Sequence, residues 1–92
     1  MPRHQHESLV LKTANYTATL ADTVISCSGT FTVTLPTASG CAGREYVIKN
    51  TGTGVITVDA NSTETIDGEL TQTLNQWDAM MIVSNGTGWI II

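Results

Sequence analysis

Residues 31–50 read FTVTLPTASGCAGREYVIKN, and this stretch decides the fold of the 92-residue chain. From Phe31 to Leu35, apolar residues alternate with threonines, which is the two-residue period of a half-buried strand. Pro36 lacks the N–H group that a strand ladder needs, so the strand should end there. A loop of small residues follows, and the β-rich run from Glu45 to Lys49 resumes as a second strand. The stretch therefore predicts strand, loop and strand.

Similar short apolar patterns recur on both sides of this stretch. They predict further strands at residues 9–11, 16–20, 23–26, 55–59, 66–67, 70–74, 77–84 and 89–92. Residues 47–58 and 81–92 align without a gap, each with a Gly-Thr-Gly turn at its centre, and both are expected to form hairpins. Charged residues make up only 13% of the chain, against about 25% in an average domain, and threonine is abundant. This composition suits strands better than helices. The predicted fold is all-β, a compact antiparallel β-sandwich or barrel-like domain.

The chain divides into an N-terminal arm or anchor at residues 1–14 and a single β-domain at residues 15–92. Residues 1–7 are polar and show no periodicity. The apolar triplet Leu9-Val10-Leu11 follows, and it is either a short strand or a segment that docks on a neighbour.

Two late segments, Ala79–Val83 and Trp89–Ile92, are apolar at every position. A strand has this pattern when both of its faces are buried, and a small sandwich covers only one of them. Because soluble monomers avoid large apolar patches, we expect a second copy of the chain to cover the other face, most simply in a homotrimer. The expected interface residues are Leu9, Val10, Leu11, Met80, Ile82, Trp89, Ile90 and Ile92.

The charge pattern and the polar residues argue against several function classes. A net charge of −4 with only four basic residues argues against nucleic-acid binding. No apolar run is long enough to cross a bilayer and no secretion signal is present, so no membrane partner is expected. No credible set of nucleophile and base, or paired carboxylates in a cleft, can be found. We therefore expect neither enzymatic activity nor a cofactor.

Two groups of residues are weak candidates for metal binding. His4 and His6 could offer imidazole nitrogens to one transition-metal ion on a threefold axis, although a solvated arm is the preferred interpretation. A second group could supply oxygen ligands to Ca²⁺, but its spacing matches no EF-hand loop and a solvated loop is preferred. This second group consists of Asp59, Asn61, Glu64 and Asp67.

Cysteines and aromatic residues each leave two interpretations open. Cys27 and Cys41 could form one disulfide, but without a secretion signal two reduced, buried thiols are preferred. Trp77, Trp89 and Tyr46 could stack against sugar rings, or they could lie in the core or in an interface, which is preferred.

Five segments together resemble a module that recurs in surface proteins of tailed-bacteriophage virions, in tail fibres, receptor-binding proteins and head-surface proteins. The segments are residues 30–36, 42–50, 52–58, 65–68 and 88–91, and the resemblance runs from about Tyr16 to Ile92. It implies a β-rich, trimeric, non-enzymatic protein.

The resemblance also implies a role and a location. It favours a capsid decoration (cement) protein or a short head fibre, because only about fifteen residues precede the module. Its partners would be copies of itself and the major capsid protein or other virion proteins. The alternative is the tip of a tail fibre that recognises host surface glycan. In either case the protein would be made in the bacterial cytoplasm and reside on the virion surface.

Overall fold

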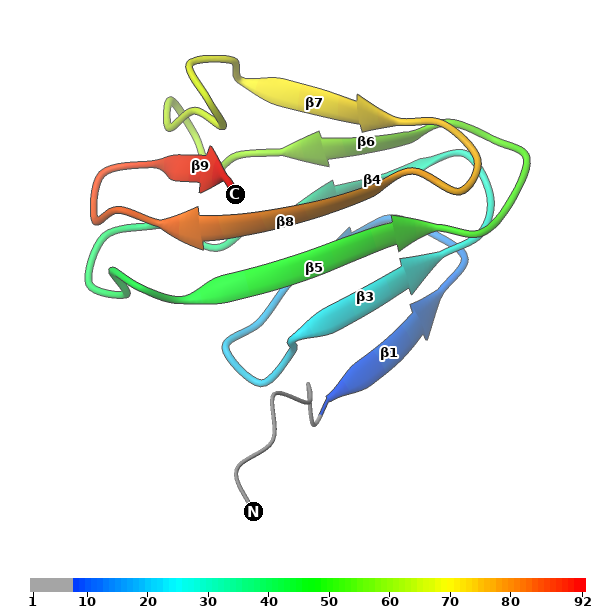
Figure 1. Cartoon of the computed structure of the whole chain (residues 1–92), viewed down its shortest axis with the longest axis horizontal. Coiled ribbons are helices and arrows are strands. Elements are labelled where there is room, and N and C mark those ends of the chain that lie inside the picture. Colours follow the sequence, from blue (N-terminus) through cyan, green and yellow to red (C-terminus); the bar gives the residue numbers. More distant parts are fainter. Residues whose placement is uncertain (1–7) are drawn as a thin grey trace.

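The computed structural model describes residues 8–92, and these residues form nine β-strands and no helix. The strands are β1 (Leu9–Lys12), β2 (Tyr16–Thr17), β3 (Val24–Cys27), β4 (Phe31–Thr34), β5 (Glu45–Asn50), β6 (Ile56–Asp59), β7 (Thr71–Leu74), β8 (Ala79–Ser84) and β9 (Trp89–Ile91). They form two sheets with the apolar core between them (Figure 1). The all-β prediction is confirmed, and most strands lie within a residue or two of their predicted positions.

The two sheets are mixed, and here the antiparallel prediction is wrong. One sheet has the strand order β1-β3-β5-β8-β9 and the other has the order β2-β4-β6-β7. The first six strands alternate between the sheets, so neighbours within a sheet are two strands apart in the chain and run parallel. Only β7, β8 and β9 add as antiparallel strands. The chain therefore begins as stacked arches, each crossing from one sheet to the other, and ends in antiparallel strands.

The predicted hairpin at residues 50–54 is one of these crossings, because β5 and β6 lie in different sheets. Its two glycines allow close contact with the preceding arch. A Cβ atom on Gly52 would lie 2.7 Å from the Ser28 hydroxyl, and one on Gly54 would lie 2.5 Å from the Gly29 carbonyl oxygen. By contrast, the predicted hairpin at residues 81–92 is confirmed, since β8 and β9 pair antiparallel.

Inward-facing side chains from both sheets form the core. Ile25, Ile48 and Met80 stand opposite one another on neighbouring strands and are buried. The rings of Tyr46 and Trp89 pack with their centroids 5.6 Å apart in a tilted arrangement, a geometry that contributes about 0.5–1.5 kcal/mol beyond burial. The alternation of apolar and polar residues read from the sequence thus places one side of each strand in the core.

Both cysteines are free thiols. Cys27 is buried in β3, and this burial raises its pKa to about 11. Cys41 is half-buried in the loop that precedes β5 and packs against the core. The arrangement agrees with the preferred interpretation of two reduced cysteines.

Part of the expected N-terminal arm belongs to the sheet. Residues 9–12 form β1, which pairs with β3, and the Val24 amide donates to the Ser8 carbonyl over 2.9 Å. Of the two interpretations of the apolar triplet at residues 9–11, the structure therefore supports the short strand. Residues 1–7, including His4 and His6, lie outside the described residues, so the metal hypothesis for these histidines stays a prediction.

Candidate interaction surface

One row of apolar side chains crosses the outward-facing side of the five-stranded sheet. The register places Leu9, Val24, Val47 and Met81 opposite one another on β1, β3, β5 and β8. The amide of Ile92 donates to the Met81 carbonyl over 2.9 Å, which extends the row past the end of β9. We call these five residues the apolar row. Because side chains alternate between the two sides of a strand, all five point away from the core.

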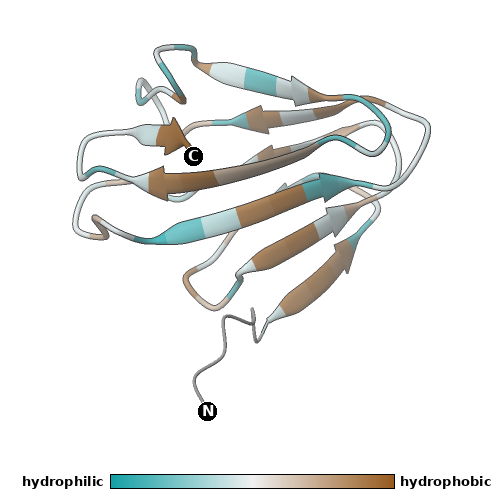
Figure 2. Ribbon diagram, viewed as in Figure 1, coloured by the Kyte–Doolittle hydropathy of each residue, from teal (hydrophilic) through white to brown (hydrophobic). Residues whose placement is uncertain are grey.

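Further apolar side chains lie on either side of the row. Leu11 lies on one side, and Val83 pairs with Ile90 on the other. The outer face comprises the apolar row together with Leu11, Val83 and Ile90. Figure 2 shows the apolar segments of its strands side by side. The charged residues Glu45 and Lys49 flank Val47 on β5. Contiguous apolar surface of this kind marks an interaction site more often than single exposed leucines do.

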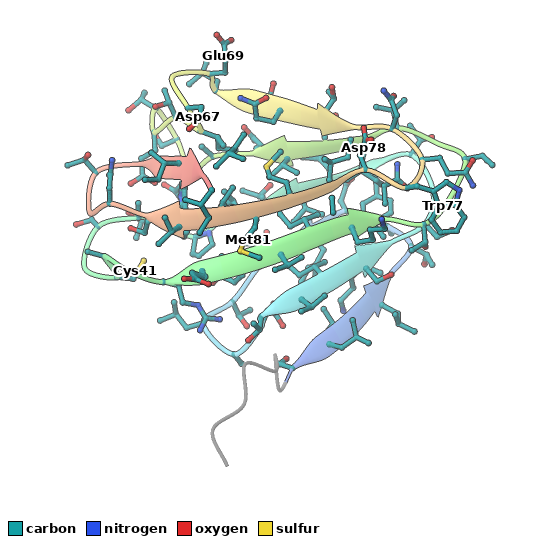
Figure 3. The ribbon with its side chains drawn as sticks, in the orientation of Figure 1. Cys41, Asp67, Glu69, Trp77, Asp78 and Met81 are labelled. Carbon is teal, nitrogen blue, oxygen red and sulfur yellow. The ribbon has the colours of Figure 1, made fainter. Side chains whose placement is uncertain are left out.

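Exposure differs along the outer face. Leu11 is 73% exposed, Leu9 62% and Ile92 60%, whereas Met81 and Ile90 are 38% and 39% exposed. Val24 and Val47, in the middle strands, are half-buried by their neighbours. The most exposed apolar side chains are therefore at the two sides of the sheet, on β1 and just after β9, while those of the middle strands are less exposed. Figure 3 shows Met81 near the middle of the sheet.

Three of the eight predicted interface residues are core residues. Met80, Ile82 and Trp89 are at most 5% exposed, since they point toward the other sheet. The apolar runs of β8 and β9 are two-sided, as the sequence indicated, but these three residues occupy the inner side.

The other predicted interface residues are at the surface or close to it. Leu9, Leu11, Ile90 and Ile92 are exposed, and Val10 is half-buried and packs against the core. Sequence reasoning missed four members of the outer face, which are Val24, Val47, Met81 and Val83. The alternation of side chains between the two sides of a strand could have identified them, because each of them precedes a buried residue and so points to the opposite side.

Trp77 is the only one of the three candidate stacking aromatics at the surface. Tyr46 and Trp89 are buried, whereas Trp77 is 62% exposed in the turn between β7 and β8 (Figure 3). Its backbone has a positive φ of 70°, which is rare for a bulky residue. The Trp77 amide donates to the Asn50 carbonyl over 2.6 Å, and the Lys49 ammonium donates to the Trp77 carbonyl. These bonds hold the backbone of Trp77 in position at one end of the five-stranded sheet.

Two of the three acidic residues considered for Ca²⁺ accept hydrogen bonds within the fold. Glu64 accepts hydrogen bonds from the Ala38 amide and the Thr37 hydroxyl, at 2.9 and 2.8 Å. Asp67 accepts one from the Ile91 amide at 3.0 Å. Within residues 8–92, no group of three His, Cys, Asp or Glu side chains is arranged to hold a metal ion.

The buried carboxylate of Asp22 also has a structural role. It accepts hydrogen bonds from the Tyr16 hydroxyl at 2.6 Å and from the Thr19 amide at 2.9 Å. The bond to Asp22 raises the pKa of Tyr16. Tyr46 donates to the Thr19 carbonyl over 2.7 Å, and burial raises its pKa. These bonds hold the loop between β2 and β3, and the part of the chain that the structure describes contains no pocket beside them.

No protein-family model, curated protein or solved structure matches this chain. Across residues 8–92, no helix has the length and apolar character to cross a membrane. The outer face and the Trp77 turn are thus the two surface features with which a function can be argued.

Proposed function

We propose that this protein is a non-enzymatic structural subunit of the bacteriophage virion surface. It associates through its outer face as a homotrimer and serves as a capsid decoration protein or a short head fibre. The observation that carries the proposal is the apolar row, which crosses β1, β3, β5 and β8 and continues past the end of β9. The sequence resemblance to virion surface modules supplies the biological setting.

The size of the outer face supports self-association. With neighbouring strands about 4.8 Å apart, a row across five strands is roughly 19 Å long. Covering it removes exposed leucine, methionine and isoleucine side chains from water, at about 25 cal/mol for each Å² buried. A symmetric assembly covers the same face on every copy, so no subunit is left with an exposed patch. In a trimer, the three faces would turn toward the shared axis.

Attachment to a shell follows from the same symmetry. The expected anchor is the N-terminal arm, of which residues 1–7 lie outside the described residues. One short segment binds weakly, but three segments on one rigid trimer engage together and raise the overall affinity by about 10²–10⁴. The major capsid protein would be the partner, after synthesis of both proteins in the bacterial cytoplasm.

The proposed role predicts saturable binding to phage heads that lack decoration. Purified protein mixed with such heads should cosediment with them and reach a plateau at a multiple of three chains per site. A chain that lacks residues 1–7 should keep its fold and its mass but bind at least about 10²-fold more weakly, because the avidity of three anchors is lost. Binding that is unchanged by the deletion would place the anchor elsewhere. Failure of the intact protein to bind any head would refute the decoration role.

Recognition of host glycan at a tail-fibre tip is a second candidate, and Trp77 is the observation that favours it. The Trp77 indole is exposed, and the Trp77 backbone has a rare conformation. Residues with strained backbones cluster at binding sites. An indole offers a flat apolar surface for a sugar ring, and Lys49, whose ammonium lies 5.9 Å from the ring centroid, offers a hydrogen-bond donor.

This second candidate predicts specific signals on an array of bacterial surface glycans. Trp77→Ala should abolish them, since stacking surface is lost, while Trp77→Phe should retain part of the signal. Thr73→Ala, on the exposed side of β7, is the control and should leave binding unchanged. An array without reproducible signals from the native protein would remove glycan recognition from consideration.

A further inference from the structure

The two edges of the five-stranded sheet differ in how they are protected. The β9 edge is covered by the loop that follows β6. The Trp89 amide donates to the Thr65 carbonyl over 2.8 Å, and the Asp67 amide donates to the Trp89 carbonyl over 3.0 Å. The Asp67 carboxylate then accepts a hydrogen bond from the Ile91 amide over 3.0 Å. The Trp89 amide and carbonyl and the Ile91 amide are therefore occupied, which hinders the addition of another strand along this edge.

The β1 edge is open. The Ser8 carbonyl accepts a hydrogen bond from the Val24 amide at the start of β3, at 2.9 Å, and the Lys12 carbonyl accepts one from the Ser28 amide just after β3, at 3.1 Å. Because alternate residues of a strand face the same neighbour, the backbone groups of Leu9 and Leu11 face away from β3. Among residues 8–92, β1 pairs with β3 alone, so these amides and carbonyls have no strand partner. Strand β1 contains no proline or bulge, and its one charged side chain, that of Lys12, lies over the Tyr16 ring with its ammonium 4.1 Å from the ring centroid.

We infer that the β1 edge binds the β1 edge of a second copy of this chain, as an antiparallel pair about a twofold axis at Val10. In this register Leu9 of one copy lies opposite Leu11 of the other. Two residues that face each other in this way exchange two hydrogen bonds, amide to carbonyl in both directions. The twofold axis produces this pair twice, so every free backbone group of Leu9 and Leu11 is matched. The two five-stranded sheets become one continuous sheet.

The side chains fit the same register. The leucines of both copies meet on the outer face, and the half-buried Val10 residues meet on the inner side. A shift by one residue would place the free groups of Leu9 and Leu11 opposite groups that already bond to β3. Pairing of β1 with β9 of another copy is disfavoured, because the Trp89 amide and carbonyl and the Ile91 amide already have partners within the chain. The edge is thus complementary to itself, which is the reason to assign a second copy as its partner.

This contact does not depend on the proposed trimer, because it uses the backbone edge of β1 and not the whole outer face. In a trimer it would join one trimer to the next, and the smallest closed assembly with both kinds of axis contains six chains. In the absence of a trimer it would give a dimer. The two associations can therefore be measured separately.

Leu11→Pro is the variant that tests the contact. Proline removes the Leu11 amide hydrogen, which faces the open edge, and leaves the hydrogen bonds between β1 and β3 in place. Leu11→Thr is the matched control, because it shortens the side chain and keeps the amide. Sedimentation equilibrium should show that Leu11→Pro has half the mass of Leu11→Thr. Both variants remove the leucine side chain from the outer face, so the difference between them reports the loss of the amide alone.

The masses distinguish this inference from the trimer proposal. A native assembly of six chains that becomes three chains in Leu11→Pro supports both the trimer and the β1 contact. A native assembly of two chains that becomes one supports the β1 contact alone. If the native protein and Leu11→Pro both contain three chains, or both contain one, the contact is overturned.

Hydrogen exchange on the native protein is a second measurement, and it needs no variant. The amides of Leu9 and Leu11 should exchange at least about 10²-fold more slowly in the assembled protein than in dilute, dissociated protein. Equal rates in the two samples contradict the pairing.

Discussion

Lysine at both Val47 and Met81 should break the trimer and leave the chain folded. The two residues are opposite one another on β5 and β8, and both belong to the apolar row. In the separate chain their side chains can extend into water, so the fold tolerates the change. In the trimer, each subunit would bury two unpaired ammonium groups, and burial of an unpaired charge costs several kcal/mol. Since about 1.4 kcal/mol is a factor of ten, association should weaken at least about 10³-fold.

A matched control exists on the other sheet. Thr57 and Thr73 form the equivalent antiparallel pair on β6 and β7. Lysines at these positions add the same charge with the same cross-strand geometry but leave the outer face unchanged. Sedimentation equilibrium should show the native mass for this control and no more than two chains for the variant of Val47 and Met81. Circular dichroism should show a folded β-protein for both. A native mass that persists in the outer-face variant would show that the subunits associate elsewhere.

The positions of the strands were predictable from the sequence because alternation is a local property. From Phe31 to Leu35, each apolar residue enters the core and each threonine does not. Backbone sterics and burial impose this pattern wherever the strand lies in the fold. The alternating pattern is the same whichever strand becomes the neighbour, so it could not indicate which strands pair or in which direction.

The pairing was not predictable because an arch and a hairpin have the same local pattern. Residues 47–58 and 81–92 align without a gap, yet the first segment crosses between sheets and the second folds back within one. The difference depends on distant contacts. Gly52 and Gly54 approach the preceding arch closely, which no property of their own segment indicates.

The candidate surface was predictable only in part. The apolar run of β8 indicated two buried sides, but it could not show whether Met80 or Met81 faces the core. That choice depends on the other sheet, which covers Met80 and leaves Met81 on the outer face. The open β1 edge was also beyond sequence reasoning, because edge strands are known only once the strand order is known.

Alanine at Asn50 should remove much of the stability of this domain. The Asn50 side chain is fully buried at the end of β5, where the chain leaves one sheet for the other. Its amide nitrogen donates to the carbonyls of Gly54 and Leu74, at 2.7 and 2.9 Å, and its oxygen accepts from the Gly52 amide at 3.0 Å. It therefore ties the crossing between β5 and β6 to the end of β7.

The expected loss follows from the groups left behind. Truncation leaves two carbonyls and one amide without their partner, and each unsatisfied buried group costs about 1–3 kcal/mol. We expect the free energy of unfolding to fall by about 3–5 kcal/mol, against a total of about 5–15 kcal/mol for a typical domain. Urea unfolding measures this directly. Asn85→Ala is the control, because Asn85 is exposed and its side chain bonds only within its own turn. It should cost about 1 kcal/mol or less.

Asn50→Asp tests whether the donor role is what matters, because the two side chains have nearly the same shape. An ionised aspartate at this position would face the Gly54 and Leu74 carbonyls without a proton to donate, so burial and these carbonyls should raise its pKa above the unfolded value of about 3.9. The folded state then binds the proton more tightly than the unfolded state. The stabilising effect of protonation is present below about pH 4 and is lost as pH rises through the folded pKa. Relative to the native protein, the variant should be least stable at about pH 7 and recover toward about pH 4 in urea unfolding. A deficit that does not change with pH would show that the amide donor is not the stabilising element.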